Sequence, residues 1–397
     1  MLLCPQSPAA RRTSARTAHR FLTAAVLSGL VMVCGCSRFR PHSHHEYVYV
    51  IAKESILRDR VAAVSNRTGE VTNGEKLEVL ERDRRFVKVK TPNGEIGWLE
   101  ARLTADQALA DQFEALHKDH LHDPVVATAT VQDDVYMHIS PGRDTDRFYR
   151  LSEGDPLSLL ERAVVPRPVS SGAAVADDAR LKPGQAPPPP PLEDWWLVRG
   201  PHGETGWVYS HLIDVNIPDA IAGFAEGQRI VGAYVLSTVD DPEYASQHSL
   251  PSAAIPEYLT VVNSWQAGLP YDFDQVRVFI WNLKKHRYET SFRERNIEGF
   301  LPVKLFKSKD PYGKTPDAMQ ELPTFSYNVL AAGAPQPVPD PPTSKTPGEI
   351  HPASVVTKTY RLEGNICRRL LPPNTQPPAE ARPVPETKKE KPSRRRR

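Results

Sequence analysis

Residues that could carry out catalysis are few in this sequence, and they are scattered. Catalysis requires a nucleophile beside a base, a metal cage, or a paired acid and base. Cys367 lies in the segment 365–370, Asn-Ile-Cys-Arg-Arg-Leu, which lacks the Gly-rich helix start that activates a thiolate. The carboxylates of residues 240–242 (Asp-Asp-Pro) and 272–274 (Asp-Phe-Asp) stand where turns favour Asp. We therefore expect no catalytic residue, no cofactor and no enzymatic activity.

Histidines gather in two places, which raises the alternative of a metal site. Three lie within residues 42–45, in a polar run that we interpret as a solvated tether. Three more, His117, His120 and His122, end a predicted helix, where positions three apart share a face. A cation near the C-terminal end of a helix is also stabilised by the helix dipole, and we favour that simpler role. We expect no metal site at either group.

Aromatic side chains offer a better candidate, a surface that binds a ligand. Trp195 and Trp196 are adjacent in a predicted strand, so their side chains face opposite sides of a sheet. One can belong to the core while the other is partly exposed, and exposed rings bind glycans and peptides by stacking and desolvation. We assign Trp98 and Trp207 to the core. The predicted ligand-binding residues are Trp195, Trp196, Tyr209 and Tyr136.

These aromatic residues belong to an internal repeat. Residues 86–103 align with residues 195–212 at an offset of 109, with 7 of 18 positions identical. Upstream, residues 73–82 align with residues 153–162 at an offset of 80. The difference is an insertion of 29 residues in the second copy, rich in Pro, Ala and Ser. We expect it to be disordered with polyproline character, because it cannot bury enough apolar surface to fold.

Each copy of the repeat predicts about five short strands. Apolar residues alternate in part over 77–80 and 86–89, as half-buried strands require. Asn93-Gly94 predicts a type I′ hairpin turn, in which both central residues take positive φ, and His202-Gly203 is its counterpart.

A helix is expected between the copies, over residues 104–121. Thr104 and Gln107 form a capping box, and apolar residues then recur three or four positions apart. The rest of the chain after residue 46 predicts strands, turns and Pro-rich segments.

The repeat resembles the bacterial SH3 (SH3b) family. The resemblance rests on a Gly-led apolar strand, an aromatic residue three positions before Val, and a closing turn followed by Gly-Trp. These are residues 74–80, 86–89 and 93–98 in the first copy, and residues 154–160, 195–198 and 202–207 in the second. The opening strand lacks the family's usual Arg-x-Gly-Pro in both copies, and Phe86 replaces Trp. The resemblance implies two small barrels that bind cell-wall peptide or glycan, or another envelope protein.

Beyond residue 216 there is no third copy. Seven runs of strand-forming residues follow, separated by tight turns, which predicts an antiparallel meander. The runs are residues 258–265, 275–282, 288–292, 300–306, 325–330, 355–362 and 366–371. A second Pro-rich excursion spans residues 334–352.

Composition and charge narrow the classes of function. Charged residues make up 25% and hydrophobic residues 40% of the chain, as in globular proteins. The 39 prolines exceed the usual share of roughly 5%, so part of the chain must be linker. Basic residues concentrate at the two ends, and residues 36–387 carry a net negative charge. A nucleic-acid partner needs a basic folded face and is therefore not expected.

The N-terminus predicts export and lipid anchoring. Four arginines within residues 11–20 precede an apolar run over 21–33, which has signal-peptide anatomy and is too short to span a membrane. The run Val33-Cys34-Gly35-Cys36 resembles the lipobox of bacterial lipoproteins, which implies cleavage before Cys36 and lipid on its thiol. Ser37 follows instead of Asp, so the resemblance implies a lipid-anchored cell-envelope protein at the outer membrane, facing the periplasm. The alternative is an uncleaved membrane anchor.

The predicted organisation follows from these segments. It consists of a signal peptide (1–35), a tether (36–46), a first SH3b domain (47–104), a helical linker (105–123), a second SH3b domain (124–216) with the Pro-rich insertion (163–193), a β-rich domain of unknown function (217–371) and a basic disordered tail (372–397). The predicted fold class is all-β: two SH3-like small barrels, an antiparallel β-rich C-terminal domain, one linking α-helix and disordered Pro-rich segments. The predicted function is binding of peptidoglycan or an envelope protein. The alternative is a scaffold or assembly lipoprotein in which the C-terminal domain binds and the barrels are spacers.

Replacing Cys36 by Ala should abolish lipid labelling and release the protein from the membrane fraction, because Cys36 alone follows a small residue, Gly35. Metabolic labelling with a fatty acid, followed by membrane fractionation, measures both effects. Cys34→Ala is the matched control and should keep its label. Labelling lost in Cys34→Ala but kept in Cys36→Ala would contradict the assignment.

Overall fold

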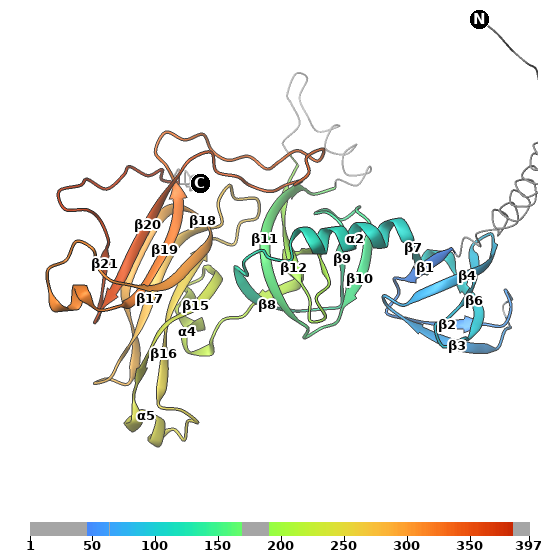
Figure 1. Ribbon diagram of the computed structural model, residues 1–397, viewed down its shortest axis with the longest axis horizontal. Coiled ribbons are helices and arrows are strands. Elements are labelled where there is room, and N and C mark those ends of the chain that lie inside the picture. Colours follow the sequence, from blue (N-terminus) through green and yellow to red (C-terminus); the bar gives the residue numbers. More distant parts are fainter. Residues whose placement is uncertain (1–45, 63, 169–189, 384–397) are drawn as a thin grey trace, which may run out of the picture. The chain divides into compact units, whose positions relative to one another are not determined.

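Strands dominate the computed structural model, which describes residues 46–62, 64–168 and 190–383 (Figure 1). Three antiparallel sheets of seven strands each form its framework. The longest described helix is α2, Gln107–Asp119, which lies in sequence between the first two sheets. The all-β fold class predicted from the sequence is confirmed.

The first two sheets have the same topology. The first has the order β3-β2-β6-β5-β4-β1-β7 and the second the order β10-β9-β13-β12-β11-β8-β14. The strands of the first are β1 (Tyr47–Val50), β2 (Glu54–Arg58), β3 (Arg67–Thr72), β4 (Lys76–Asp83), β5 (Phe86–Lys90), β6 (Ile96–Glu100) and β7 (Thr104–Asp106). Those of the second are β8 (Ala127–Val131), β9 (Val135–His138), β10 (Arg147–Leu151), β11 (Pro156–Pro166), β12 (Leu192–Arg199), β13 (Thr205–Tyr209) and β14 (Ile213–Val215). We call them the first and second barrels.

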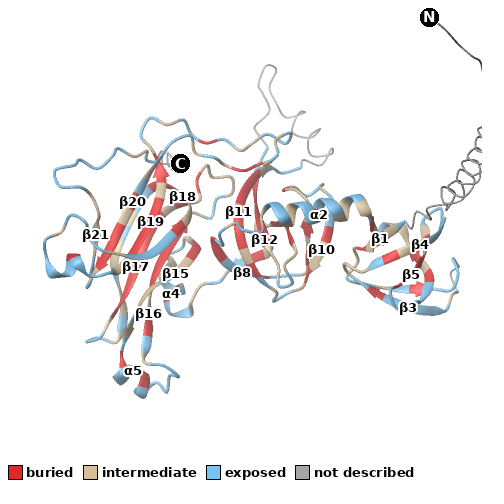
Figure 2. Ribbon diagram, in the orientation of Figure 1, coloured by how far each residue is buried: buried red, intermediate tan, exposed pale blue. Residues whose placement is uncertain are grey.

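The two barrels also share strand register. Phe86 of β5 faces Glu100 of β6, and Trp195 of β12 faces Tyr209 of β13, at the positions that the sequence repeat relates. Buried segments recur along the strands of each sheet (Figure 2). Burial alternates along β5 of the first barrel, whereas residues 193–198 of β12 are all buried in the second. The internal repeat of the sequence is therefore a repeat of the fold.

The turn after β5 differs from the type I′ turn predicted. Gly94 and Gly203 have φ values of 88° and 91°, whereas Asn93 and His202 are outside the positive-φ region. The Gly94 N–H donates to the Thr91 carbonyl oxygen over 2.9 Å, which closes a four-residue turn that ends at Gly94 itself. A type I turn followed by such a glycine also matches the twist of paired strands, so only the glycine needs positive φ.

Helix α2 begins later than predicted. Thr104 lies in β7, where it pairs with Val50 of β1, so the capping box is wrong. Asp106 is the N-cap instead, and its carboxylate accepts a hydrogen bond from the Leu109 N–H over 2.9 Å. Phe113 is 1% exposed and packs in the core of the second barrel.

The third sheet is the predicted antiparallel meander, with its strands in sequence order. They are β15 (Arg229–Asp240), β16 (Ala254–Asn263), β17 (Phe273–Asn282), β18 (Arg287–Ser308), β19 (Leu322–Leu330), β20 (Val355–Glu363) and β21 (Ile366–Arg369). Strand β15 was not predicted, and β18 unites two predicted runs. A register shift between Phe300 and Lys304 lets this long strand bend without ending.

A few residues of the Pro-rich excursion and of the predicted tail form isolated β-bridges. In the excursion 334–352, Pro339 bridges Ile350, and Glu349 bridges Ala163 of β11. Further along, Glu380 bridges Ala331. These bridges hold the excursion and residues 372–383 at single points, which the prediction of disorder did not include. Residues 384–397 of the predicted tail lie outside the described part.

Strands β11 and β12 extend into the predicted insertion. Ala163 pairs with Trp195, Pro166 pairs with Leu192, and the Arg167 N–H donates to the Pro191 carbonyl oxygen over 2.8 Å. The boundaries 163 and 193 are therefore wrong at both ends. Residues 169–189 lie outside the described part.

A buried ion network joins the second barrel to the third sheet. Arg162 of β11 is 8% exposed, and its guanidinium contacts Asp194 over 3.0 Å and Asp272 over 2.8 Å. It also donates to the carbonyl oxygens of Leu269 and Tyr271, each over 2.9 Å. A buried charge is costly unless it is paired and fully hydrogen-bonded, and these four acceptors meet that requirement.

The predicted export segment, residues 1–35, lies outside the described part of the chain, as does the tether up to residue 45. Within the described ranges, none of the helices has both the length and the apolar character needed to cross a membrane. Cleavage and lipid attachment thus remain predictions.

Replacing residues 169–189 by a short Gly-Ser link should change the melting temperature by only a few degrees. The strands on either side pair up to Pro166 and Leu192, and loop-closure free energy changes by only about 0.6 kcal/mol per doubling of length. Thermal unfolding followed by circular dichroism measures the effect.

The control is the longer deletion of residues 164–191. It removes the last pairs of β11 and the hydrogen bond from the Val164 N–H to the Gly348 carbonyl oxygen, which spans 2.7 Å. This deletion should lower the melting temperature clearly more. Equal effects of both deletions would contradict the observed ends of β11 and β12.

Candidate functional site

The structure buries both predicted tryptophans of the second barrel. Trp195 is 2% exposed and Trp196 is 6% exposed. Trp196 belongs to the main core of the barrel, and Trp195 packs in a smaller cluster with Leu160 and Trp207. The prediction of an exposed indole is therefore wrong. The large apolar area that suggested a binding surface is instead removed from water, and this burial stabilises the folded barrel.

The other two predicted residues, Tyr209 and Tyr136, are half-buried and covered by arginines. The Arg143 guanidinium lies 4.7 Å from the Tyr209 ring centroid, and that of Arg147 lies 4.4 Å from the Tyr136 ring centroid. Arg143 is held by two hydrogen bonds to the Glu193 carboxylate, of 2.9 and 2.7 Å. These rings already make cation–π contacts within the chain, so the predicted stacking platform is occupied by the protein itself.

The equivalent positions of the first barrel are open. Phe86 and Trp98, which correspond to Trp195 and Trp207, are both only half-buried. Ile56, on the neighbouring strand β2, is 43% exposed. The shared register places aromatic rings at equivalent strand positions in both barrels. These rings are covered in the second barrel and lie at the surface of the first.

These residues line a groove. Two adjoining cavities, of about 1050 and 370 Å³, share Phe86 and Glu100 in their walls. Val61, in the connection between β2 and β3, lines one side, and Arg84 and Arg85, in the turn between β4 and β5, line the other. We call this the first-barrel groove and define it by Val61, Arg84, Phe86, Trp98, Glu100 and Arg102.

The groove combines apolar surface with charges of both signs. Arg102 contacts the Glu100 carboxylate, and this hydrogen bond raises the pKa of the Arg102 guanidinium. Arg84 takes a left-handed conformation, with φ of 50°, at the tip of the turn that forms the rim. Aromatic rings beside both carboxylate and guanidinium groups suit an amphipathic ligand that itself carries both charges, such as a short peptide.

The sequence pointed to the second barrel because its aromatic content is visible there, whereas the coverage of these rings is not. In the second barrel, Leu116 of α2 and Val165 of the extended β11 pack on the cluster that contains Trp195. The apolar spacing of the helix was visible in the sequence, but its partner was not. A signal for the open groove was nevertheless present, because the first copy lacks the insertion that follows β11.

A further cavity, of about 640 Å³, lies where α2 meets both barrels, with Tyr49, Glu114 and Glu204 among its lining residues. Asn73 ties the barrels together beside it. Its side-chain amide donates to the Phe148 carbonyl oxygen over 3.1 Å and accepts from the Arg150 N–H over 2.9 Å. We assign these contacts to the packing of one barrel on the other.

The other residues considered for chemistry have separate environments. Burial raises the pKa of the Cys367 thiol to about 12, so it is protonated at neutral pH and a poor nucleophile. His117 contacts the Thr205 hydroxyl over 3.1 Å, whereas His120 pairs with Asp123 over 2.6 Å. The two histidines therefore do not converge on one metal position.

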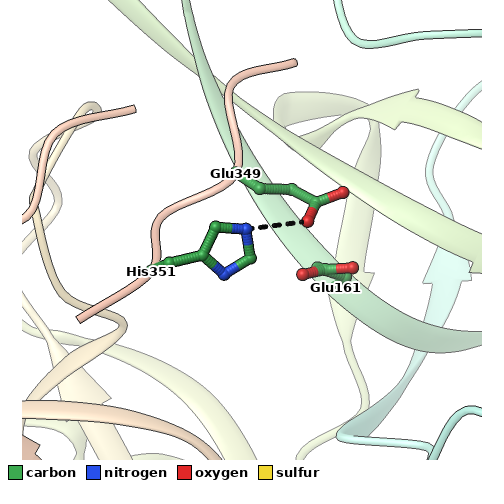
Figure 3. Close-up of side chains that lie close together, drawn as sticks. All are labelled: Glu161, Glu349 and His351. Atoms are coloured by element: carbon green, nitrogen blue, oxygen red, sulfur yellow. Dashed lines mark ion pairs between the residues drawn. The ribbon is translucent and has the colours of Figure 1, made fainter. Parts of the chain in front are cut away.

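A group of metal-ligand side chains does converge elsewhere. Glu161 of β11 meets Glu349 and His351 of the Pro-rich excursion, with one ligand atom from each within 4.8 Å of the others (Figure 3). Burial and the neighbouring Glu161 raise the pKa of the Glu349 carboxyl to about 8. The sequence analysis missed this group because its members come from segments far apart in the chain.

Trp195→Ala should destabilise the protein by about 3–5 kcal/mol, the usual cost of removing a buried aromatic side chain. Phe86→Ala, at the half-buried equivalent position, should cost less than half as much. Trp195→Phe is the control and should recover most of the loss, because the indole N–H has no acceptor among the described residues. Urea unfolding of the three variants measures these differences. A larger loss in Phe86→Ala than in Trp195→Ala would contradict the assignment of core and groove.

Comparison with known families connects the groove to one of them. Residues 57–105 match the bacterial SH3 domain family, a segment that runs from β2 into β7 and holds the residues that define the groove. A search of curated protein sequences gives no match to the chain. The chain thus contains one bacterial SH3 domain, and the open groove belongs to it.

Proposed function

We propose that this chain is a membrane-anchored envelope lipoprotein that binds cell-wall peptide through the first-barrel groove. The main support for the proposal is that the open, amphipathic groove lies within the segment that matches bacterial SH3 domains. Domains of this family are modules of a type that binds the cell wall. Stem peptides of peptidoglycan carry carboxylate and amine groups, which the charges of the groove complement.

The second barrel, in this proposal, is a second SH3b domain whose binding face has become part of the protein's own packing. Its strand order and register support the relationship. Burial of Trp195 and Trp207, at 2% and 3% exposure, argues against a ligand at that position. The second barrel then positions the first one and carries the third sheet through the Arg162 ion network.

We propose a binding role and not a catalytic one. The raised pKa of Cys367 supports this choice. The candidate carboxylates have structural roles: Asp241 is the N-cap of helix α5 (Pro242–Gln247), and Asp272 pairs with Arg162. Lipid on Cys36 would hold the chain at a membrane, and the tether would place the first barrel next to the anchor in sequence. Such an arrangement is suited to linking a membrane to the cell wall.

Trp98→Ala should weaken binding to purified peptidoglycan by tenfold or more. Loss of an anchoring tryptophan typically costs about 2 kcal/mol or more, and each 1.4 kcal/mol corresponds to about one decade in affinity. Co-sedimentation of the purified chain with peptidoglycan gives the affinity, and the melting temperature of the same sample reports folding. The matched control is Trp265→Ala, since Trp265 follows strand β16 of the third sheet and is 71% exposed.

The two variants separate the proposal from its alternative, binding by the C-terminal domain. Weaker binding in Trp98→Ala with unchanged binding in Trp265→Ala supports the first-barrel groove. The reverse pattern assigns the binding to the C-terminal domain and makes the barrels spacers. Unchanged binding in a folded Trp98→Ala protein refutes the groove.

A further inference from the structure

The backbone holds the excursion 334–352 against the second barrel at one place. Glu349 forms a β-bridge with Ala163, and the Val164 N–H donates to the Gly348 carbonyl oxygen over 2.7 Å. Asp340 and Glu349 are also joined, by a hydrogen bond of 2.9 Å from the Asp340 N–H to the Glu349 carbonyl oxygen. The position of the Glu349 side chain beside Glu161 is therefore set by main-chain pairing.

Negative charge is concentrated at this place and poorly balanced. Glu349 is 4% exposed, the Glu161 carboxyl group has an oxygen within 4.8 Å of its own, and the Asp340 carboxylate lies 3.8 Å from His351. Within the described ranges, the basic side chain that contacts Glu349 is His351, over 3.3 Å. A buried carboxylate of this kind is costly unless a cation accompanies it.

The nearest arginine in sequence cannot supply that cation. Arg162 follows Glu161 in β11 and lines the same cavity as Glu161 and His351. However, its guanidinium is already committed to Asp194 and Asp272. Among the described residues, neither a lysine nor an arginine therefore pairs with the Glu349 carboxyl group.

The donor atoms fit a transition-metal ion. Two carboxylates and one imidazole converge on the same point in Figure 3, from strand β11 and from the excursion. Ligand distances of ~2.0–2.2 Å hold donor atoms no more than roughly 4.4 Å apart. The three donor atoms lie within 4.8 Å of one another, so small side-chain movements bring them to this spacing, and His351, whose side chain is 57% exposed, has room to move.

Room for further ligands lies beside the three side chains. Glu161 and His351 line a cavity of about 380 Å³, together with Asp123. Water from this cavity can complete the coordination of an ion. Calcium and magnesium prefer sites made only of oxygen, whereas an imidazole beside carboxylates favours zinc or manganese.

We propose that Glu161, Glu349 and His351 bind a divalent transition-metal ion, of which zinc is the best match, and that the ion clamps the Pro-rich excursion onto the second barrel. The role is structural: the ion joins two segments that are distant in sequence and balances the buried carboxylates. The clamp is independent of the groove and does not require the proposed binding of cell wall.

The test is calorimetric titration of the chelator-treated, purified chain with zinc chloride. His42, His44 and His45 are first replaced by Ala, because these histidines of the tether could bind zinc on their own. We expect one ion per chain and a rise of several degrees in melting temperature. Manganese should bind more weakly, and calcium should not compete.

Two site variants and one control complete the experiment. Glu349→Gln and His351→Ala should each lower the zinc affinity at least tenfold. Without zinc, Glu349→Gln should melt at nearly the same temperature, because Gln is a neutral group of similar size that can donate a hydrogen bond to Glu161. The control is His286→Ala, because His286 pairs with the single carboxylate of Asp241 over 2.7 Å, and its zinc affinity should be unchanged.

The outcomes are distinguishable. Stoichiometric zinc binding that both site variants weaken, and the control does not, supports the clamp. Absence of saturable binding at micromolar zinc overturns it, as does binding that His351→Ala leaves intact. His351 is largely exposed, so this variant is expected to fold even if Glu349→Gln does not.

Discussion

The shared register of the two barrels is the constraint on which the proposed function depends. A single bridge joins Arg58 to Trp98 in the first barrel, and the equivalent bridge joins His138 to Trp207 in the second. Because backbone pairing fixes these positions, both barrels present aromatic rings at the same place. The side chains packed over these rings differ between the barrels. The rings line a groove on the first barrel, whereas they form a second core in the second barrel.

The segments that cover the aromatic rings of the second barrel also connect this barrel to the neighbouring parts of the chain. Helix α2 contributes Leu116 to it, and the extension of β11 contributes Val165. The same extended strand carries Arg162 toward the third sheet and Glu161 toward the excursion. The second barrel therefore uses for contacts with its own neighbours the face that remains open on the first barrel.

Local chemistry made much of the fold predictable from the sequence. Glycines at positive φ, such as Gly94, and alternating apolar residues specify turns and strands over a few positions, so the repeat and the meander could both be predicted. Contacts between distant segments could not. Neither the burial of Trp195 under α2 nor the approach of Glu349 to Glu161 leaves a local pattern. For this reason the sequence favoured the copy whose aromatic rings are buried, although the residue types and strand positions were identified.

The most direct test of the proposed groove is hydrogen–deuterium exchange of the full chain with and without soluble peptidoglycan fragments. Backbone amides that a ligand covers exchange more slowly, and the method reports every segment at once. We predict protection confined to residues 59–62, 83–86 and 98–102, the walls of the first-barrel groove. Protection of β12 and β13, or of the third sheet with none in the first barrel, would contradict binding at that groove.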